Sequence, residues 1–121
     1  MLLSRVADAL YWISRYLERA EHTARLVDVA RDLGLDRAAA ARSRAIERLY
    51  RSLGFPSAEG EQSLVRVALF DTSHRNSVAA CVMAARENAR QVREEISSDM
   101  WEQINDLFLR VRKLQEASAG R

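Results

Sequence analysis

Apolar residues recur along the first part of the chain with the spacing of an amphipathic helix. Seven of them are separated alternately by four and three residues, namely Val6, Leu10, Ile13, Leu17, Ala20, Ala24 and Val27. This spacing places them on one face, and such a face is normally buried against other elements. We expect a helix that is capped by Ser4 and runs to about Leu33, where Gly34 provides a C-terminal stop.

Two shorter helices are predicted in the middle of the chain. The first spans residues 37–53, with Asp36 as its N-cap. It ends at Gly54-Phe55-Pro56, because proline cannot continue the helical hydrogen bonding. The second spans residues 58–69 and is capped by Ser57.

Residues 70–76 are polar and unpatterned, which indicates a loop, and two longer helices follow it. A helix that begins at residue 76 or 77 and reaches residue 96 repeats the first apolar pattern with Val78, Val82, Ala85, Ala89, Val92 and Ile96. The last helix spans residues 100–117, with Asp99 and Glu102 as a capping pair. Its expected inward residues are Trp101, Ile104, Leu107, Phe108, Val111 and Leu114. We therefore predict an all-α bundle of about five helices, with the first, fourth and fifth in the core.

Composition and charge support one domain over residues 1–121. The chain is 48% apolar and 30% charged, and its net charge of +2 comes from interspersed rather than segregated charges. Such mixing is typical of solvated helix faces and argues against nucleic-acid binding. The N-terminus lacks the pattern of a signal peptide, and no apolar run is long enough to cross a membrane. Cys81 is the single cysteine, so no disulfide can form within the chain. We expect a cytoplasmic protein.

The strongest candidate for chemistry is a pair of charge clusters beside the apolar faces of the first and fourth helices. The first cluster comprises Glu18, Arg19, Glu21 and Arg25, and the second comprises Arg86, Glu87, Asn88 and Arg90. One interpretation is a set of ion pairs between the two helices that fixes their register. The other is an anion or carboxylate site lined by arginines, whose planar guanidinium suits bidentate binding.

Metal binding and nucleophilic catalysis find little support in the sequence. Glu18 and His22 share a helix face, but the further inward carboxylates of a di-metal bundle are missing, and we expect no metal and no cofactor. Cys81 lies at the edge of the apolar face, as a small buried residue does, and neither histidine is beside it by local spacing.

Three sequence blocks resemble the alpha-E domain family, bacterial helical proteins named for a Glu-Arg motif. The first block covers Met1–Ala7, Leu10–Trp12 and Arg15–Glu21, and contains Glu18-Arg19. The second covers Phe70-Asp71, Ser77-Val78, Ala85–Arg90 and Arg93-Glu94. The third is Ser98–Glu102 with Asn105.

The resemblance implies an all-helical protein encoded beside a circularly permuted ATP-grasp ligase and a transglutaminase-like peptidase. It thereby implies a role in making or modifying a peptide, as an accessory interaction subunit that binds one of these partners. The alternative is an enzyme of the same system that holds a carboxylate or phosphate in the Arg/Glu/Asn cluster, so enzymatic activity stays open. A third alternative is a self-associating structural bundle.

The chain departs from the family pattern in three respects. It is shorter than typical members, residues 32–63 are contracted and unmatched, and Arg75 stands where proline is expected. We expect a short chain of this kind to cover its exposed apolar surface by forming a homo-oligomer.

Overall fold

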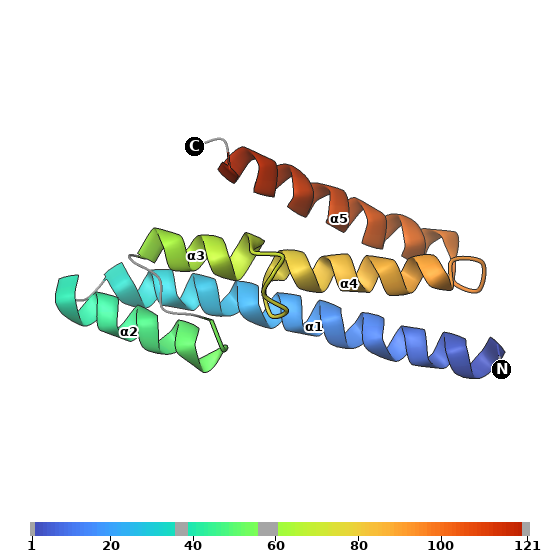
Figure 1. Cartoon of the computed structure of the whole chain (residues 1–121), viewed down its shortest axis with the longest axis horizontal. Coiled ribbons are helices and arrows are strands. Elements are labelled where there is room, and N and C mark those ends of the chain that lie inside the picture. The colour runs from blue at the N-terminus through green and yellow to red at the C-terminus, as the bar shows by residue number, and fades with distance from the viewer. Residues whose placement is uncertain (1, 36–38, 56–60, 120–121) are drawn as a thin grey trace.

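The computed structural model describes residues 2–35, 39–55 and 61–119, and these residues form five helices (Figure 1). The helices are α1 (Leu2–Leu35), α2 (Ala39–Ser52), α3 (Glu61–Phe70), α4 (Val78–Gln91) and α5 (Ser98–Ala119). The prediction of an all-α bundle of about five helices is therefore confirmed. Within the described ranges, no helix is long and apolar enough to cross a membrane.

The most extensive contact between two of the described helices is that of α1 with α4, which run in opposite directions (Figure 1). Small residues supply much of this interface, because Ala9, Ala20, Ala85 and Ala89 are all buried. Alanine lets two helix backbones approach closely, and Ile13 then fills the space between α1, α4 and the start of α5. All the predicted apolar residues of these two faces are buried or half-buried, and five further residues are buried with them, namely Ala9, Thr23, Ala30, Ala79 and Cys81.

A second core cluster lies at the other end of α1, where α2 and α3 pack against it. Its buried residues come from all three helices and the turn after α2: Val27, Ala30, Ile46, Tyr50, Phe55, Leu64 and Ala68. The expectation that the first, fourth and fifth helices alone form the core was therefore wrong, because α1 is long enough to support two pairs of helices in succession.

The turn that ends α2 follows the sequence prediction closely. The N–H of Phe55 donates to the carbonyl of Tyr50 at 3.1 Å, and that of Gly54 donates to the carbonyl of Arg51 at 2.9 Å. Gly54 has a φ of +82°, so these two bonds form a Schellman motif with glycine in the left-handed conformation. The rings of Phe55 and Tyr50 meet edge to face at 6.3 Å, which supplies the apolar contact of this motif.

Several helix ends differ from the sequence prediction. Helix α1 continues past Gly34 to Leu35, and the predicted caps Asp36 and Ser57 lie outside the described residues. Helix α4 ends at Gln91, and the chain passes through short turns before α5 begins at Ser98. These turns still bury Val92 and half-bury Ile96, which explains why the apolar spacing suggested a longer helix.

Serine residues cap both C-terminal helices. Ser77 is the N-cap of α4, at the predicted start of this helix, because its hydroxyl accepts from the N–H of Ala80 at 3.1 Å. At α5 the predicted Asp99/Glu102 pair was wrong: the Ser97 hydroxyl accepts from the N–H of Met100 at 3.1 Å. Asp99 instead occupies the first turn, where its negative charge is favourable beside the helix N-terminus.

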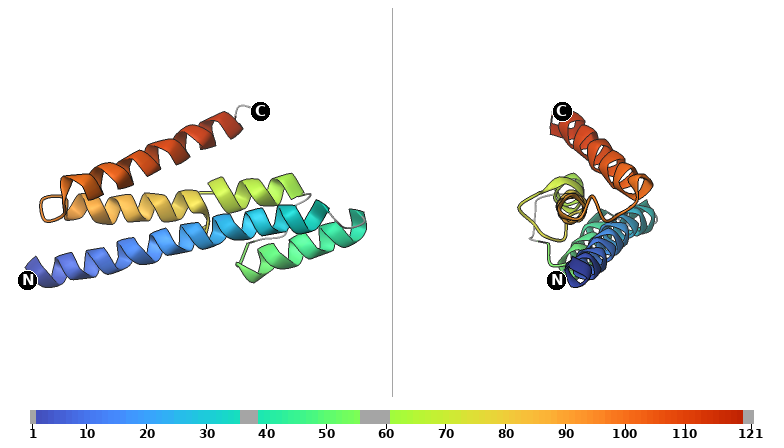
Figure 2. Two further views of the ribbon diagram at one scale, coloured as in Figure 1. Left: turned by 180° about the vertical axis from the view of Figure 1, so that it is seen from behind. Right: turned by 90° about the vertical axis from the view of Figure 1, so that its right-hand side faces the viewer.

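Helix α5 packs mainly on α4 and diverges from α1 along its length, as the two views in Figure 2 show. Of its predicted inward residues only Ile104 is fully buried, whereas Trp101, Phe108 and Val111 are half-buried. Leu107 and Leu114 are exposed. The expectation that both lie inward was wrong, because α1 turns away from α5.

The connector from Asp71 to Ser77 joins three parts of the fold. His74 stacks on Phe55 with ring centroids 4.3 Å apart, and its Nε2 lies 2.7 Å from the carbonyl oxygen of Gly54. The side-chain amide of Asn76 donates to the carbonyl of Leu53 at 2.9 Å. The backbone carbonyl of Asn76 accepts from the hydroxyl of Thr23 at 3.0 Å. The connector therefore ties the end of α2 and the middle of α1 to the start of α4.

Candidate interaction surface

The predicted α1 cluster is a set of charges on the helix surface, with local pairing. The guanidinium of Arg25 lies 2.6 Å from the carboxylate of Glu21, and both side chains are largely exposed. Arg15 and Glu18 are 3.8 Å apart. Pairs of this kind, one helical turn apart at the surface, contribute only about 0.3–0.5 kcal/mol. They therefore do not explain why α1 packs on α4.

Three residues of the α4 cluster, Glu87, Asn88 and Arg90, also form their hydrogen bonds within their own helix. Arg90 makes two hydrogen bonds to the carboxylate of Glu87, at 2.6 and 3.0 Å, on the exposed side of the helix. This pairing lowers the pKa of Glu87 and raises that of Arg90. The amide of Asn88 donates to the carbonyl of Ala84 on its own helix at 2.9 Å.

Among the described residues, every ion pair joins two residues of one helix. The interpretation that carboxylates of the first helix pair with arginines of the fourth was therefore wrong. The reason is geometric: alanines bring the two helices so close that the intervening space holds no long charged side chain. In the part of the chain that the structure describes, no hydrogen bond or ion pair joins the four predicted site residues of α1 to the four of α4.

Arg86 is the member of the α4 cluster that crosses between helices. Its Nε–H donates to Oδ1 of Asn105 on α5 at 2.9 Å. Its guanidinium carbon lies 4.5 Å from the ring centroid of Phe108 and 5.5 Å from that of Trp101. Arg93 covers the same Trp101 ring at 4.8 Å. Arginine–aromatic stacking therefore holds α5 on α4, whereas the predicted partners of Arg86 were carboxylates of the first helix.

A second arrangement of arginine and aromatic rings lies on α1, and it contains the arginine of the Glu-Arg motif. The guanidinium carbon of Arg19 is 5.7 Å from the ring centroid of Tyr16, and the Tyr16 ring is 5.9 Å from that of Trp12. Trp12 meets Tyr11 edge to face at 5.2 Å. We call Tyr11, Trp12, Tyr16 and Arg19 the aromatic strip.

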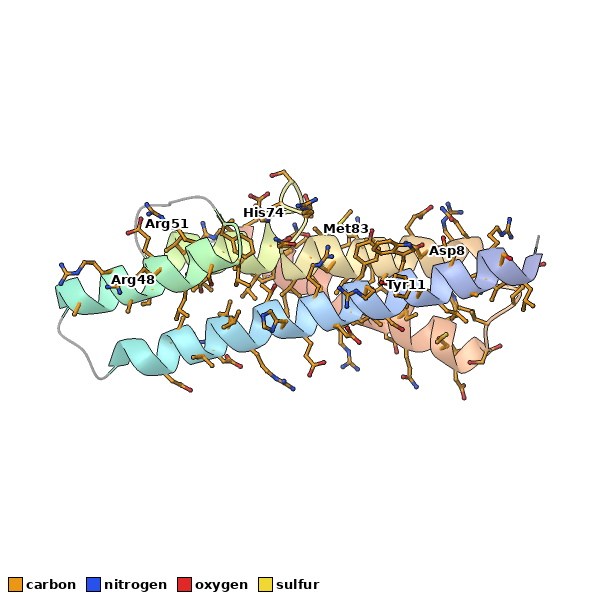
Figure 3. The ribbon with its side chains drawn as sticks, turned by 90° about the horizontal axis from the view of Figure 1, so that it is seen from below. Asp8, Tyr11, Arg48, Arg51, His74 and Met83 are labelled. Atoms are coloured by element: carbon orange, nitrogen blue, oxygen red, sulfur yellow. The ribbon has the colours of Figure 1, made fainter. Side chains whose placement is uncertain are left out.

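The first half of the aromatic strip is open to solvent, because Tyr11 is 55% and Trp12 39% exposed, whereas Tyr16 and Arg19 are half-buried. In Figure 3, Tyr11 lies over α1, and His74 lies at the connector on the edge of the molecule away from α5. The spacing of Tyr11, Trp12 and Tyr16 spreads these aromatic residues over more than one face of α1. Their exposure was not predicted, because helical spacing alone does not show which flank of α1 lacks a neighbouring helix.

Cys81 lies beneath this region, fully buried between α1 and α4. Its thiol lies 3.4 Å from the carbonyl oxygen of Arg75, and burial raises its pKa while the nearby charge of Arg19 opposes that shift. The prediction of a small buried residue is confirmed. In the described ranges, no three His, Cys, Asp or Glu side chains gather in a way that would hold a metal ion.

The C-terminal half of α5 is held more loosely than its first half. A cavity of about 350 Å³ opens between α4 and α5, lined in part by Met83, Phe108 and Val111. A second, of about 330 Å³, lies beside Phe70 at the end of α3. Gln115 borders both cavities and donates to the carbonyl of Phe70 at 2.9 Å, which tethers α5 to α3.

Comparison with known proteins found one family. A family model described as a predicted alpha-helical domain with a conserved ER motif matches residues 2–120. The Glu-Arg pair named in that description corresponds to Glu18-Arg19 by the resemblance given above. No curated protein and no solved structure showed a significant match to the chain.

Proposed function

Because the chain belongs to the Alpha-E family, whose model covers nearly all of it, we propose that it is an accessory interaction subunit of an ATP-grasp-linked system that makes or modifies peptides. The partner that we propose is an ATP-grasp-type ligase, with a transglutaminase-like protein as the second candidate. The aromatic strip would form the binding surface. Its exposure is the observation that supports this proposal.

The chemistry of the strip is that of a protein-binding surface. Tryptophan, tyrosine and arginine are the residues most enriched where interfaces concentrate their binding energy. Tryptophan and tyrosine each offer a large, nearly rigid contact area with a polar group at its edge, so they lose little conformational entropy when they are buried. Arginine contributes a planar guanidinium with five donors in a fixed geometry. On α1 these three residue types are stacked in sequence, which holds them in position before a partner binds.

Arg19 is central to this proposal because it joins the Glu-Arg motif to the exposed rings. It stacks on Tyr16 and is half-buried, and it has no ion-pair partner among the described residues. Its guanidinium donors therefore remain available to a carboxylate or carbonyl of a partner. Glu18, by contrast, points toward the exposed Arg15 on the same helix.

Co-purification from the native host tests the proposal. We expect the tagged chain to recover an ATP-grasp-type ligase at moderate salt, and the variants Trp12→Ala and Arg19→Ala to lose most of it. The matched controls are Leu109→Ala and Arg112→Ala on α5, which remove an exposed leucine and an exposed arginine away from the strip. Circular dichroism spectra equal to that of the wild type are required of all four variants.

Two results would count against the proposal. Equal recovery of the ligase by strip and control variants would show that the strip is not the binding surface. Recovery of the chain alone would favour the alternative of a self-associating structural bundle.

A further inference from the structure

A row of apolar residues runs along an exposed flank of α5. Met100, Leu107 and Leu114 are each seven residues apart, so they lie in one line along the helix. Leu107 is 39% and Leu114 61% exposed. With Ile104 and Val111 they form an alternating four-and-three spacing, the pattern of a coiled-coil seam. We call Met100, Leu107 and Leu114 the α5 row.

Helix α1 carries a matching row on the flank that is opposite to the aromatic strip. Leu3, Leu10 and Leu17 are also seven residues apart, and Leu3 is 82% exposed. Leu10 and Leu17 are half-buried and pack against the cluster that contains Ile104 of α5, which brings this flank of α1 next to α5; Tyr16 borders the same cluster. We call these three residues the α1 row.

The two rows border one apolar strip with α4 beneath it. Helices α1 and α5 run in the same direction on two sides of α4, and they diverge (Figure 2). Each row spans two heptads, about 21 Å of helix at 1.5 Å per residue. A helix of similar length laid between the rows would therefore cover both, and α5 of a second copy has that length and that apolar pattern.

The charges at the outer rim of α5 identify the occupant and its direction. Asp99 and Asp106 lie beside the first half of the α5 row, and Arg110 and Lys113 lie beside the second half; all four are exposed. When two such helices pair in a parallel arrangement, like charges face each other. When they pair antiparallel about Leu107, the acidic half of each faces the basic half of the other.

We propose that the chain forms a two-fold symmetric dimer in which the α5 helices pack antiparallel, each placed between the α1 and α5 rows of its partner. The contact is self-complementary, because the same residues are used by both copies, as a closed two-fold interface requires. It places four helices, α1 and α5 from each copy, around a shared apolar core. The aromatic strip stays outside this contact, so the dimer does not depend on the proposed function.

Sedimentation of two leucine variants tests the location of the interface. Leu107→Lys places two charges at the centre of the dimer, and we expect its dissociation constant to rise by about tenfold or more. Leu109→Lys is the matched control: Leu109 is two residues away and 50% exposed but lies outside the row, so we expect an unchanged dissociation constant. Circular dichroism shows whether each variant is folded.

A mixing experiment tests the antiparallel charge pairing and leaves the apolar rows intact. The double variant Arg110→Glu/Lys113→Glu has an acidic rim, and Asp99→Ser/Asp106→Lys has a basic one. We expect each to dimerise more weakly than the wild type and the two together to form a heterodimer in preference to either homodimer.

The proposal is overturned by a wild-type chain that stays monomeric at high concentration. It is also overturned by a dimer that Leu107→Lys and Leu109→Lys affect equally, or by rim variants that show no preference for the heterodimer. A monomer would leave the apolar rows for a different protein to cover.

Discussion

His74 offers the sharpest test of the fold, because three contacts of one side chain hold the connector against the end of α2. The ring stacks on Phe55 at 4.3 Å, its Nε2 bonds to the carbonyl of Gly54 at 2.7 Å, and its Nδ1 accepts from the N–H of Asn76 at 3.2 Å. His74→Ala removes all three. The connector then loses its attachment to the Schellman turn of α2, and only the amide of Asn76 continues to cap it.

The expected cost follows from these contacts. An aromatic pair contributes about 0.5–1.5 kcal/mol, and a hydrogen bond at a partly exposed site about 1 kcal/mol or less. Together they give a loss of about 2–3 kcal/mol. For a chain of 121 residues, one kcal/mol corresponds to about 4 °C in melting temperature, so His74→Ala should lower it by about 8–12 °C.

The chain provides its own control, because its other histidine, His22, is exposed on α1. Thermal unfolding followed by circular dichroism should place His22→Ala within about 0.5 kcal/mol of the wild type. His74→Phe keeps the stacking and loses both hydrogen bonds, so its melting temperature should lie between those of wild type and His74→Ala. Equal melting temperatures of His74→Ala and His22→Ala would show that the connector does not hold the two halves of the fold together.

Three further predictions concern single side chains. Arg86→Ala should lower the free energy of urea unfolding by about 2 kcal/mol, because α4 and α5 lose one hydrogen bond and two ring contacts. Arg90→Ala removes only an exposed ion pair and should lower it much less, and equal losses would contradict the bridging role of Arg86. Cys81 should resist alkylation by iodoacetamide in the folded protein and react fully in urea, because its thiol is buried and burial raises its pKa. Full labelling of the folded protein would contradict this prediction and show that the site opens. Hydrogen bonds from the hydroxyl and N–H of Ser73 lower the pKa of Asp71 below its ordinary value of 3.8, so this carboxylate stabilises the fold above pH 3.8 and loses that contribution as the pH falls through its folded pKa. The stability difference between wild type and Asp71→Asn should therefore shrink in acid, and a constant difference in unfolding experiments would contradict the assignment.

Most of the fold was predictable from apolar spacing, because the buried faces of α1 and α4 keep a regular period over many turns. The end of α2 was predictable for a local reason, since glycine adopts the left-handed conformation that its turn requires. The second core around α2 and α3 was harder to foresee. Periodicity shows which face of a helix is buried, and it does not show which helix covers that face.

The candidate site was less predictable for the same reason. The sequence placed Arg86 correctly at the edge of a helix contact but assigned it carboxylate partners, where the structure provides Asn105, Phe108 and Trp101. The exposure of Leu107 depends on the path of α5 relative to α1, and the exposure of Trp12 depends on which flank of α1 lacks a neighbouring helix; both are set by packing at distant positions. Neither exposure leaves a signal in the local sequence.

The central claim is that the exposed strip containing Arg19 of the Glu-Arg motif binds an ATP-grasp-type ligase. Isothermal titration of the purified ligase with wild-type chain and with Arg19→Ala tests it most directly, with Arg112→Ala as the matched control. We predict saturable binding that Arg19→Ala weakens about tenfold or more and Arg112→Ala leaves unchanged. Equal affinities of wild type and Arg19→Ala, or no heat of binding from the wild type, would contradict the claim.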